Sequence, residues 1–270
     1  MAAYIYPTHD DPPKVIDLKD IDQTYNNGAS FVLQDLNFAV LQDEKKGKFI
    51  SLLGASGSGK STILRYISGL QTPSSGSILV NGVPPGKKNR VAMVFQEYSS
   101  MPWYTVLDNV SLALDYKGIS KQDRYQQAME MIELVGLTGH ESKYAQIPAL
   151  SGGQLQRVAI ARSLLANNRI LLMDEPFGAL DINTRLQMQD LLLSIQEKFK
   201  MYVVFVTHDI SEAVYLSDTI YMMKTPPSRI VLEQEINLPE HRTHELKRSV
   251  AFMDYVHSVE DSMIKLSEKV

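Results

Sequence analysis

The segment FISLLGASGSGKSTILRYISG, residues 49–69, sets the architecture of this 270-residue chain. Its first five residues are apolar with little polar interruption, which is typical of a strand buried on both faces of a sheet. A glycine-rich loop follows, and then Ile63, Leu64 and Ile67 recur at helical spacing before Gly69, a residue type that commonly ends helices. A strand, a loop and a helix in this order predict an α/β protein.

The glycine-rich loop matches the pattern G-x-x-x-x-G-K-[S/T] and lies between a strand and a helix, the context that this pattern requires. Glycines allow a tight turn whose N–H groups point at phosphate oxygens, and the positive end of the helix adds to the attraction. We expect Lys60 to neutralise the β- and γ-phosphates of a nucleotide and the Ser61 hydroxyl to bind Mg²⁺. The full predicted set is Gly54, Ser56, Gly57, Ser58, Gly59, Lys60, Ser61 and Thr62. A glycine-rich turn without a ligand is the competing interpretation, and the flanking elements disfavour it.

Two adjacent carboxylates end a second strand-like segment. Residues 170–174 are apolar up to Asp174, and Glu175 follows, at the strand end where ligand sites of open α/β sheets collect. Adjacent carboxylates are costly there unless they face a cation or polarised water. We expect Asp174 to hold Mg²⁺ through water and Glu175 to act as the general base that orients or deprotonates the attacking water. A charged strand end that caps a helix is the competing interpretation.

A second candidate anion site lies in Leu150-Ser151-Gly152-Gly153-Gln154, which precedes an amphipathic helical pattern. The Ser-Gly-Gly turn would open that helix and direct its N–H groups at an anion. One nucleotide needs only one cradle for its γ-phosphate, so a second cradle indicates two different nucleotides or a site between two subunits. Taken alone, the motif is only a helix start.

Three single residues complete the predicted site. Gln96 follows the strand-like segment 91–95 and could reach Mg²⁺ or the attacking water, although a loop glutamine is more often simply exposed. His208 follows a third buried strand, 202–206, and could bond the γ-phosphate, although a lone histidine more often caps the next helix. Tyr25 could stack on adenine, although a strand tyrosine is usually part of the packing.

Other segments predict the remaining architecture. Alternating apolar residues across 15–40, with the turn signal Asn26-Asn27-Gly28, predict antiparallel strands. A hairpin is predicted from Ser77-Ile78-Leu79-Val80 through Asn81-Gly82 to Val83. Residues 105–150 carry helical patterns, and after Pro226-Pro227 we expect a short strand pair and a helix over 244–269 that packs on the body or regulates it. The expected divisions are an N-terminal extension (1–14), a main domain (15–240) with a helical insertion (about 97–160), and a C-terminal helix (241–270).

The composition and charge of the chain disfavour several classes of function. A formal charge of −4 and a pI near 5.9 disfavour nucleic-acid binding, which normally shows a basic face. The absence of cysteine excludes disulfides and cysteine-ligated metals. No apolar run reaches the length of about 18 residues that a membrane-spanning helix needs. If the chain acts at a membrane, we therefore expect it to do so by binding a partner protein. The first residues carry no secretory signal, which leads us to expect the cytoplasm.

Together these motifs resemble the ABC (ATP-binding cassette) ATPase family across residues 15–237. In family terms the loop 54–62 is similar to Walker A, Gln96 to the Q-loop, 151–154 to the signature motif, 170–175 to Walker B, Gly178-Ala179-Leu180-Asp181 to the D-loop, and His208 to the switch histidine. Tyr25 matches the base-stacking aromatic, and Asp181 joins the expected nucleotide-binding set. The resemblance implies a P-loop ABC cassette with a mostly parallel core sheet, an antiparallel β-lobe and a helical insertion. It also implies a head-to-tail dimer in which Walker A of one subunit and the signature of the other enclose each ATP with its Mg²⁺.

Two segments are similar to the importer branch for nitrate, sulfonates, taurine and bicarbonate, namely 101–106 (MPWYTV) and 235–242 (EINLPEHR). The chain departs from that branch at 97–100, where bulkier apolar residues are usual, and at 42–46, a stretch that is longer than usual. The resemblance implies an ATPase subunit at the cytoplasmic face of the plasma membrane that energises import of a small anion. Its implied partners are permease subunits, a second ATPase subunit that is identical or different, and indirectly a substrate-binding protein.

A soluble ABC ATPase that acts on DNA or ribosomes is the rival class. Such proteins carry long coiled coils, zinc modules or two cassettes, and here one uninterrupted cassette and an acidic pI count against them. A lipid-handling ABC machine is a third possibility. Within the importer hypothesis, Trp103 is expected to contact the permease, with a buried packing role as the competing interpretation.

Overall fold

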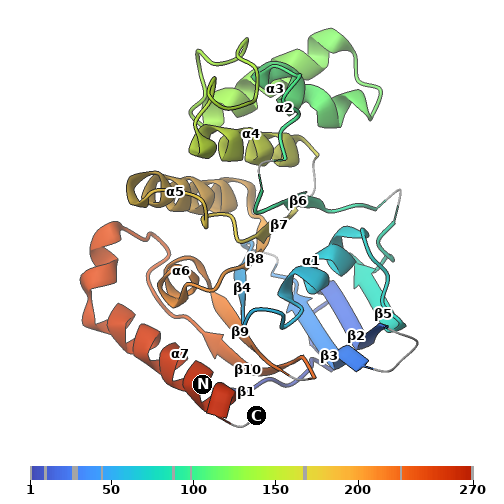
Figure 1. The fold of residues 1–270 in the computed structure, drawn as a ribbon, viewed down its shortest axis with the longest axis vertical. Coiled ribbons are helices and arrows are strands. Elements are labelled where there is room, and N and C mark those ends of the chain that lie inside the picture. The colour runs from blue at the N-terminus through green and yellow to red at the C-terminus, as the bar shows by residue number, and fades with distance from the viewer. Residues whose placement is uncertain are drawn as a thin grey trace.

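The computed structural model of the chain describes residues 2–8, 11–25, 30–43, 45–86, 89–97, 99–166, 169–225 and 227–268. The predicted turn Asn26-Asn27-Gly28 and the end of the predicted C-terminal helix, Lys269, lie outside these ranges. Figure 1 shows a sheet-containing body with a helical lobe above it and a small β-lobe at one side. This architecture confirms the predicted α/β class with a parallel core, an antiparallel lobe and helices.

The core sheet has seven strands in the order β1-β10-β9-β4-β8-β7-β6. Its members are β1 (Ala2–Ala3), β4 (Phe49–Leu53), β6 (Ala92–Val94), β7 (Ile170–Asp174), β8 (Tyr202–Val206), β9 (Thr219–Lys224) and β10 (Arg229–Glu235). β9, β4, β8, β7 and β6 run parallel to one another. Because parallel strands end at the same edge of a sheet, the segments that follow β4, β6, β7 and β8 are brought together.

The β-lobe is a three-stranded antiparallel sheet in the order β3-β2-β5, with β2 at Lys14–Tyr25, β3 at Ser30–Leu41 and β5 at Ser75–Val80. We predicted that β5 forms a hairpin with a strand that begins at Val83, and this prediction is wrong. β5 pairs with β2, and Val83 forms only an isolated bridge with Val80. The turn at Asn81-Gly82 does form, with both residues at positive φ (51° and 74°). Pro84-Pro85 follow Val83, and since proline has no N–H donor, a second strand does not extend from this turn.

The helices fall into two groups. Those of the helical lobe are α2 (Val106–Asp115), α3 (Lys121–Leu134) and α4 (Gly152–Leu165), while α1 (Lys60–Ser68), α5 (Ile182–Phe199), α6 (Ile210–Leu216) and α7 (Val250–Glu268) belong to the body. In the lobe, Thr105, Ser120 and Ser151 each cap a helix by accepting a hydrogen bond from the backbone N–H three residues further on. These caps explain where the helical patterns of the lobe begin.

Two expectations for the C-terminal part need correction. In place of a strand pair after residue 227, one strand, β10, pairs back with β9. The predicted helix from residue 244 is divided, since a 3-10 helix covers His244–Arg248 and α7 begins at Val250. The division falls at Ser249, which has an extended backbone and whose Oγ accepts from the Phe252 N–H (3.2 Å), so that Ser249 starts a new helix.

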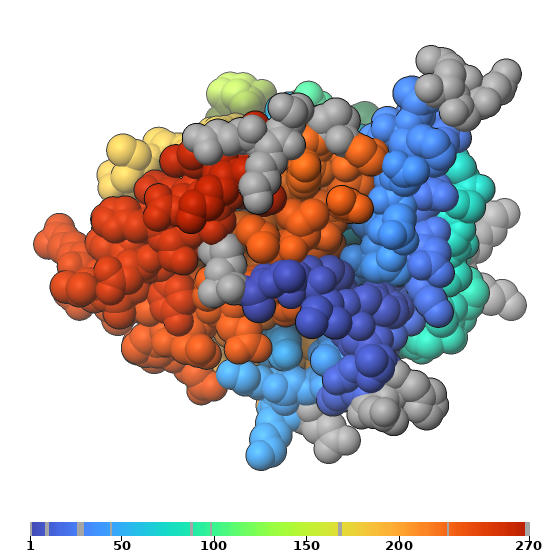
Figure 2. Space-filling model, turned by 90° about the horizontal axis from the view of Figure 1, so that it is seen from below, coloured from blue at the N-terminus to red at the C-terminus, as the bar shows by residue number. Residues whose placement is uncertain are grey.

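The N-terminal residues, predicted as an extension, are built into the body. β1 pairs antiparallel with β10, and the Tyr4 ring meets the Tyr221 ring edge to face with 5.4 Å between centroids. The backbone N–H of Ala39 in β3 donates to Tyr4 Oη (3.1 Å). Figure 2 shows this dark blue segment lying along the orange surface of β9 and β10, beside the blue β-lobe. The N-terminal segment therefore joins the core sheet to the β-lobe.

Two hydrophobic clusters cover the two faces of the core sheet. In β4, Phe49 and Leu53 belong to the cluster shared with the helical lobe, α5 and α7, whereas Ile50 and Leu52 belong to the cluster shared with α1 and the β-lobe. Burial on both faces explains why these strands are continuous apolar runs in the sequence. Across the described ranges, none of the helices combines the length and the apolar character that crossing a bilayer requires.

Replacing Tyr4 by alanine is expected to lower the free energy of unfolding by about 2 kcal/mol, because it removes an aromatic contact and a hydrogen bond between the two sheets. Denaturant unfolding of the full chain measures the change. The matched control is Ile5→Ala, since the Ile5 side chain is 78% exposed, and its effect should stay below about 0.5 kcal/mol. Equal losses in the two variants would show that the N-terminal segment does not join the sheets.

Candidate nucleotide-binding site

The loop between β4 and α1 forms a tight cage at the carboxyl end of β4. Its turn is closed by the Ser58 N–H, which donates to the Ala55 carbonyl (3.2 Å). Gly59 precedes α1 with a φ of 80°, and a Cβ there would lie 2.6 Å from Leu33 Cδ2, so only glycine satisfies both the backbone angle and the space. Among the described residues no side chain caps α1, which leaves its first N–H groups to bind an anion.

Lys60 directs its charge across this loop. Its Nζ donates to the carbonyl oxygens of Gly54 (2.8 Å) and Ala55 (2.9 Å) and to Ser58 Oγ (3.4 Å). The residue is buried, and burial lowers the pKa of Lys60, while the two carboxylates at the end of β7 act in the opposite direction. A cation held in a cage of backbone groups is suited to phosphate oxygens.

Ser61 and Asp174, the two predicted metal ligands, lie side by side. The Ser61 hydroxyl donates to Asp174 Oδ1 over 2.9 Å. Burial raises the pKa of Asp174, and the charge of Glu175 raises it further, whereas the Ser61 hydrogen bond lowers it. The site thus gathers oxygen ligands with a surplus of negative charge, which a hard divalent cation would offset.

Three predicted residues meet at one carboxylate oxygen, Glu175 Oε2. Gln96 Nε2 donates to this oxygen over 3.4 Å, and His208 Nδ1 lies 3.4 Å from it, with the His208 side chain 71% exposed. The Glu175 N–H is held by the Val206 carbonyl (3.0 Å), and its φ of 44° costs a non-glycine residue on the order of 1–3 kcal/mol. Residues at the ends of β6, β7 and β8 therefore meet at the Glu175 carboxylate, and the fold holds the Glu175 backbone in a strained conformation.

Tyr25 and Asp181 have no described interaction with this cluster. Tyr25 ends β2 with 50% of its surface exposed, and its Oη accepts from Gln71 Nε2 (3.4 Å). Asp181 caps α5, because its carboxylate accepts from the Thr184 N–H (3.1 Å) and from Thr184 Oγ1 (2.7 Å). Asp181 therefore has a structural role whatever its contact with a nucleotide.

The turn formed by Ser151–Gln154 lies in the helical lobe. It opens α4 with a capping box, in which Ser151 Oγ accepts from the Gln154 N–H (3.3 Å) and Gln154 Oε1 accepts from the Ser151 N–H (2.9 Å). A Cβ on Gly153 would lie 2.3 Å from Thr184 Cγ2, so the starts of α4 and α5 fit closely together. Figure 1 shows α4 in the lobe and α1 against the strands of the body. The two candidate anion cradles of one chain thus open two helices in separate parts of the fold.

Arg185 and Glu212 lie near the site, although no sequence pattern singled them out. Arg185 Nη2 donates to the Leu180 carbonyl (3.4 Å), and its guanidinium lies 3.6 Å from Glu212 and 3.9 Å from Asp209. Thr207 Oγ1 donates to the same buried Glu212 (2.8 Å), whose pKa is raised by burial. These bonds join the loop before α5 to the segment that carries His208. A local pattern does not reveal the pair because its members come from two different helices.

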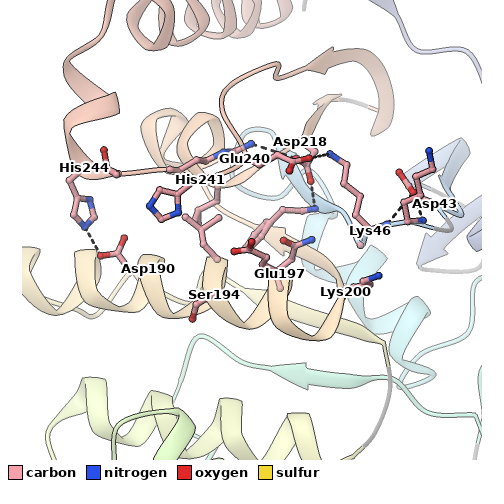
Figure 3. Close-up of a pocket in the computed structure, with 18 residues that line it drawn as sticks. Asp43, Lys46, Asp190, Ser194, Glu197, Lys200, Asp218, Glu240, His241 and His244 are labelled. Carbon is pink, nitrogen blue, oxygen red and sulfur yellow. Dashed lines mark hydrogen bonds and ion pairs between the residues drawn. The ribbon is translucent and has the colours of Figure 1, made fainter.

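A hollow lies between α5 and the segment that leads from β10 to α7 (Figure 3), with a volume of about 770 Å³. Its charged side chains largely pair with one another, as in Lys46–Glu240 (3.0 Å), Asp190–His244 (2.8 Å) and Asp218–Arg242 (3.5 Å). None of the predicted nucleotide-binding residues lines it. This hollow is therefore separate from the candidate site at the ends of the parallel strands.

The caged lysine, the strand-end carboxylates and the parallel sheet define a P-loop nucleoside-triphosphate site. The family model described as "ABC transporter" matches residues 33–178. The chain is 40% identical over 251 residues to the nitrate import ATP-binding protein NrtD of Synechocystis, which covers 89% of this chain and 91% of the relative. The chain belongs to the ABC transporter family and is an ATPase of that family.

Other similar proteins include the aliphatic sulfonates import ATP-binding protein SsuB of Bacillus thuringiensis, 41% identical over 80% of this chain and 84% of the relative. The taurine import ATP-binding protein TauB of Pseudomonas putida is 41% identical over 83% of each chain. Among solved structures, the dimeric structure of a bacterial ABC transporter cassette is 32% identical, with a TM-score of 0.70 over 83% of this chain and 100% of that chain. The same values hold for a post-hydrolysis state of that cassette bound to ADP and Pi.

The close fit between α4 and α5 predicts that Gly153→Ala lowers the free energy of unfolding by about 1–2 kcal/mol, because the added Cβ overlaps Thr184 Cγ2. Thr184→Ser removes this methyl group and keeps the hydroxyl that bonds Asp181. The double variant should therefore recover most of the loss, and a double-mutant cycle by denaturant unfolding measures the recovery. Simple additivity of the two substitutions would contradict the fit.

Proposed function

We propose that this chain is the ATP-hydrolysing subunit of an ABC importer that carries a small anion, such as nitrate, bicarbonate or a sulfonate. The ATPase chemistry rests on one observation, the meeting of Gln96, Glu175 and His208 near the caged Lys60. The import role is supported by similarity to nitrate, sulfonate and taurine import subunits along most of their length. That similarity favours import over the soluble and lipid-handling alternatives.

In the proposed cycle the loop 54–62 binds the β- and γ-phosphates of ATP. Lys60 Nζ exchanges the carbonyl oxygens of Gly54 and Ala55 for phosphate oxygens, which carry more negative charge. Backbone N–H groups of the loop and of the first turn of α1 supply further hydrogen bonds. Tyr25, half exposed at the end of β2, offers its ring face to the adenine.

Ser61 and Asp174 are the residues proposed to hold Mg²⁺. The fit rests on their 2.9 Å contact and on the burial that raises the pKa of Asp174, since a divalent cation would stabilise the buried carboxylate. Gln96 donates to Glu175 through Nε2, which leaves Oε1 as the atom of Gln96 that would bind the cation. When bound, Mg²⁺ neutralises negative charge on the phosphate oxygens.

Glu175 is the proposed general base. Its carboxylate orients or deprotonates the water that attacks the γ-phosphorus. Gln96 and His208 both face Oε2 and fix the direction of the carboxylate. Because the His208 side chain is 71% exposed, it is free to contact the γ-phosphate from the open side of the site.

The turn at Ser151–Gln154 is proposed to complete the nucleotide site of a second subunit. Within one chain it belongs to the helical lobe, whereas the phosphate loop belongs to the body. The N–H groups of Gly152 and Gly153 open α4 and would bind the γ-phosphate of the nucleotide held by the partner. Asp181 caps the neighbouring helix beside this turn. A similar cassette with a dimeric structure supports the pairing.

The permease contact is proposed on an exposed aromatic face of the helical lobe. Trp103 is 67% exposed, which contradicts a buried packing role for it. Tyr104, Tyr144 and Ile147 are also exposed, and the Tyr104 carbonyl accepts from the Ala145 N–H (3.0 Å), so the two loops that carry these side chains adjoin. Exposed aromatic clusters are typical of interfaces. Docking there would hold the chain at the cytoplasmic face of the membrane and link it to a substrate-binding protein only through the permease.

Glu175→Gln is expected to lower ATP turnover by roughly 10²- to 10⁴-fold while ATP still binds, because the substitution removes the base and preserves the shape of the site. Lys60→Ala should instead weaken ATP binding itself. Steady-state turnover and equilibrium binding of a fluorescent ATP analogue, measured on both variants, separate the two effects. Wild-type turnover in Glu175→Gln, or unchanged affinity in Lys60→Ala, would contradict the assigned roles.

A photo-crosslinking residue at Trp103 should capture an integral membrane protein when the intact transporter is irradiated. The control position is Val250, which is 77% exposed at the start of α7 in the body. Mass spectrometry of the crosslinked product identifies the captured chain. Capture at Val250 alone, or at neither position, would remove the support for docking through the helical lobe.

A further inference from the structure

His140 contacts the side chain of Gln154 although its position carries no sequence motif. His140 lies in the connection between α3 and α4, and its Nε2 is 2.9 Å from Gln154 Nε2. Its Nδ1 lies 3.4 Å from the Thr138 carbonyl. The imidazole thus bridges a backbone carbonyl of the connection and the side chain that closes the capping box of α4.

The neighbouring hydrogen bonds determine which atoms of Gln154 and His140 donate and which accept. Gln154 Oε1 accepts from the Ser151 N–H, so the amide NH₂ faces His140 as a donor. His140 Nε2 must then be the acceptor, and the proton of the neutral ring lies on Nδ1, where it is donated to the Thr138 carbonyl. One tautomer of His140 therefore fixes one orientation of the Gln154 amide.

The backbone around His140 is well held. The His140 N–H donates to the Leu137 carbonyl (3.0 Å), and the His140 carbonyl accepts from the Lys143 N–H (2.9 Å). The same connection is bound to the start of α2, where the Val106 N–H donates to the Lys143 carbonyl (2.9 Å) and the Leu107 N–H donates to the Glu141 carbonyl (3.1 Å). The connection thus joins the segment that follows Trp103 to the turn that opens α4.

We propose that His140 is a positioning residue for the Ser151–Gln154 turn. By accepting from Gln154 Nε2, the imidazole keeps Gln154 Oε1 on the Ser151 N–H and so holds the first turn of α4 in the shape that presents its N–H groups. The inference rests on the proposed role of that turn at the nucleotide of a second subunit. It also makes His140 one of the points at which the proposed docking face is bonded to the turn.

Three variants of the full chain test the acceptor role. His140→Leu removes the acceptor, His140→Gln offers an oxygen acceptor, and His140→Lys offers only donors. We expect His140→Leu and His140→Lys to lower kcat for ATP about 3- to 10-fold, the worth of one well-placed hydrogen bond, and His140→Gln to stay within about 2-fold of wild type. Affinity for a fluorescent ATP analogue should not change, since the phosphate loop of the same chain is untouched.

The control is His257→Leu, which replaces an exposed histidine on α7 and should leave kcat unchanged. Ser151→Arg tests the turn itself and should abolish turnover. If Ser151→Arg abolishes turnover while His140→Leu keeps wild-type kcat, or if His140→Lys is as active as His140→Gln, the positioning role is overturned and the proposed function stands. Wild-type kcat in Ser151→Arg would instead overturn the proposed role of the turn.

Discussion

The parallel order β4-β8-β7-β6 is the constraint on which the rest of the structure depends. Since parallel strands end at one edge, it brings together the loop 54–59, Gln96, Glu175 and His208 from distant parts of the chain. Both faces of this sheet are buried, which fixes the edge against two hydrophobic clusters. Such a frame is needed to hold Glu175 at a positive φ, because a strained residue persists only where its surroundings determine its conformation.

The helical lobe is bonded to this edge by a contiguous set of contacts. From the exposed Trp103 face, backbone hydrogen bonds lead to the connection that carries His140, and His140 holds Gln154. The start of α4 packs on the start of α5 at Gly153, and Arg185 of α5 pairs with Glu212 beside the His208 segment. These contacts supply a physical route from the proposed permease contact to the proposed nucleotide site.

Apart from the strand predicted after Asn81-Gly82 and the helix break at Ser249, features set by neighbouring residues could be predicted from the sequence, whereas features set by distant partners could not. The loop before Lys60, the buried strands and the capped helices each have a local cause, so their patterns were sufficient. The pairing of β10 with β9, and of β1 with β10, depends on which edge is open in the folded sheet. Likewise the Arg185–Glu212 and His140–Gln154 contacts join elements that lie close together in the fold, and the spacing of residue types along the sequence does not show this.

The central claim is that each ATP lies between the phosphate loop of one subunit and the Ser151–Gln154 turn of the other. Lys60→Ala disables the loop and Ser151→Arg disables the turn, so neither variant alone forms a working site. A mixed dimer of the two contains one site with both halves intact. We therefore expect ATP turnover to reappear when the two inactive chains are mixed and mixed dimers are isolated with two affinity tags. Isolated mixed dimers that hydrolyse ATP no faster than the separate variants would contradict a site shared between subunits.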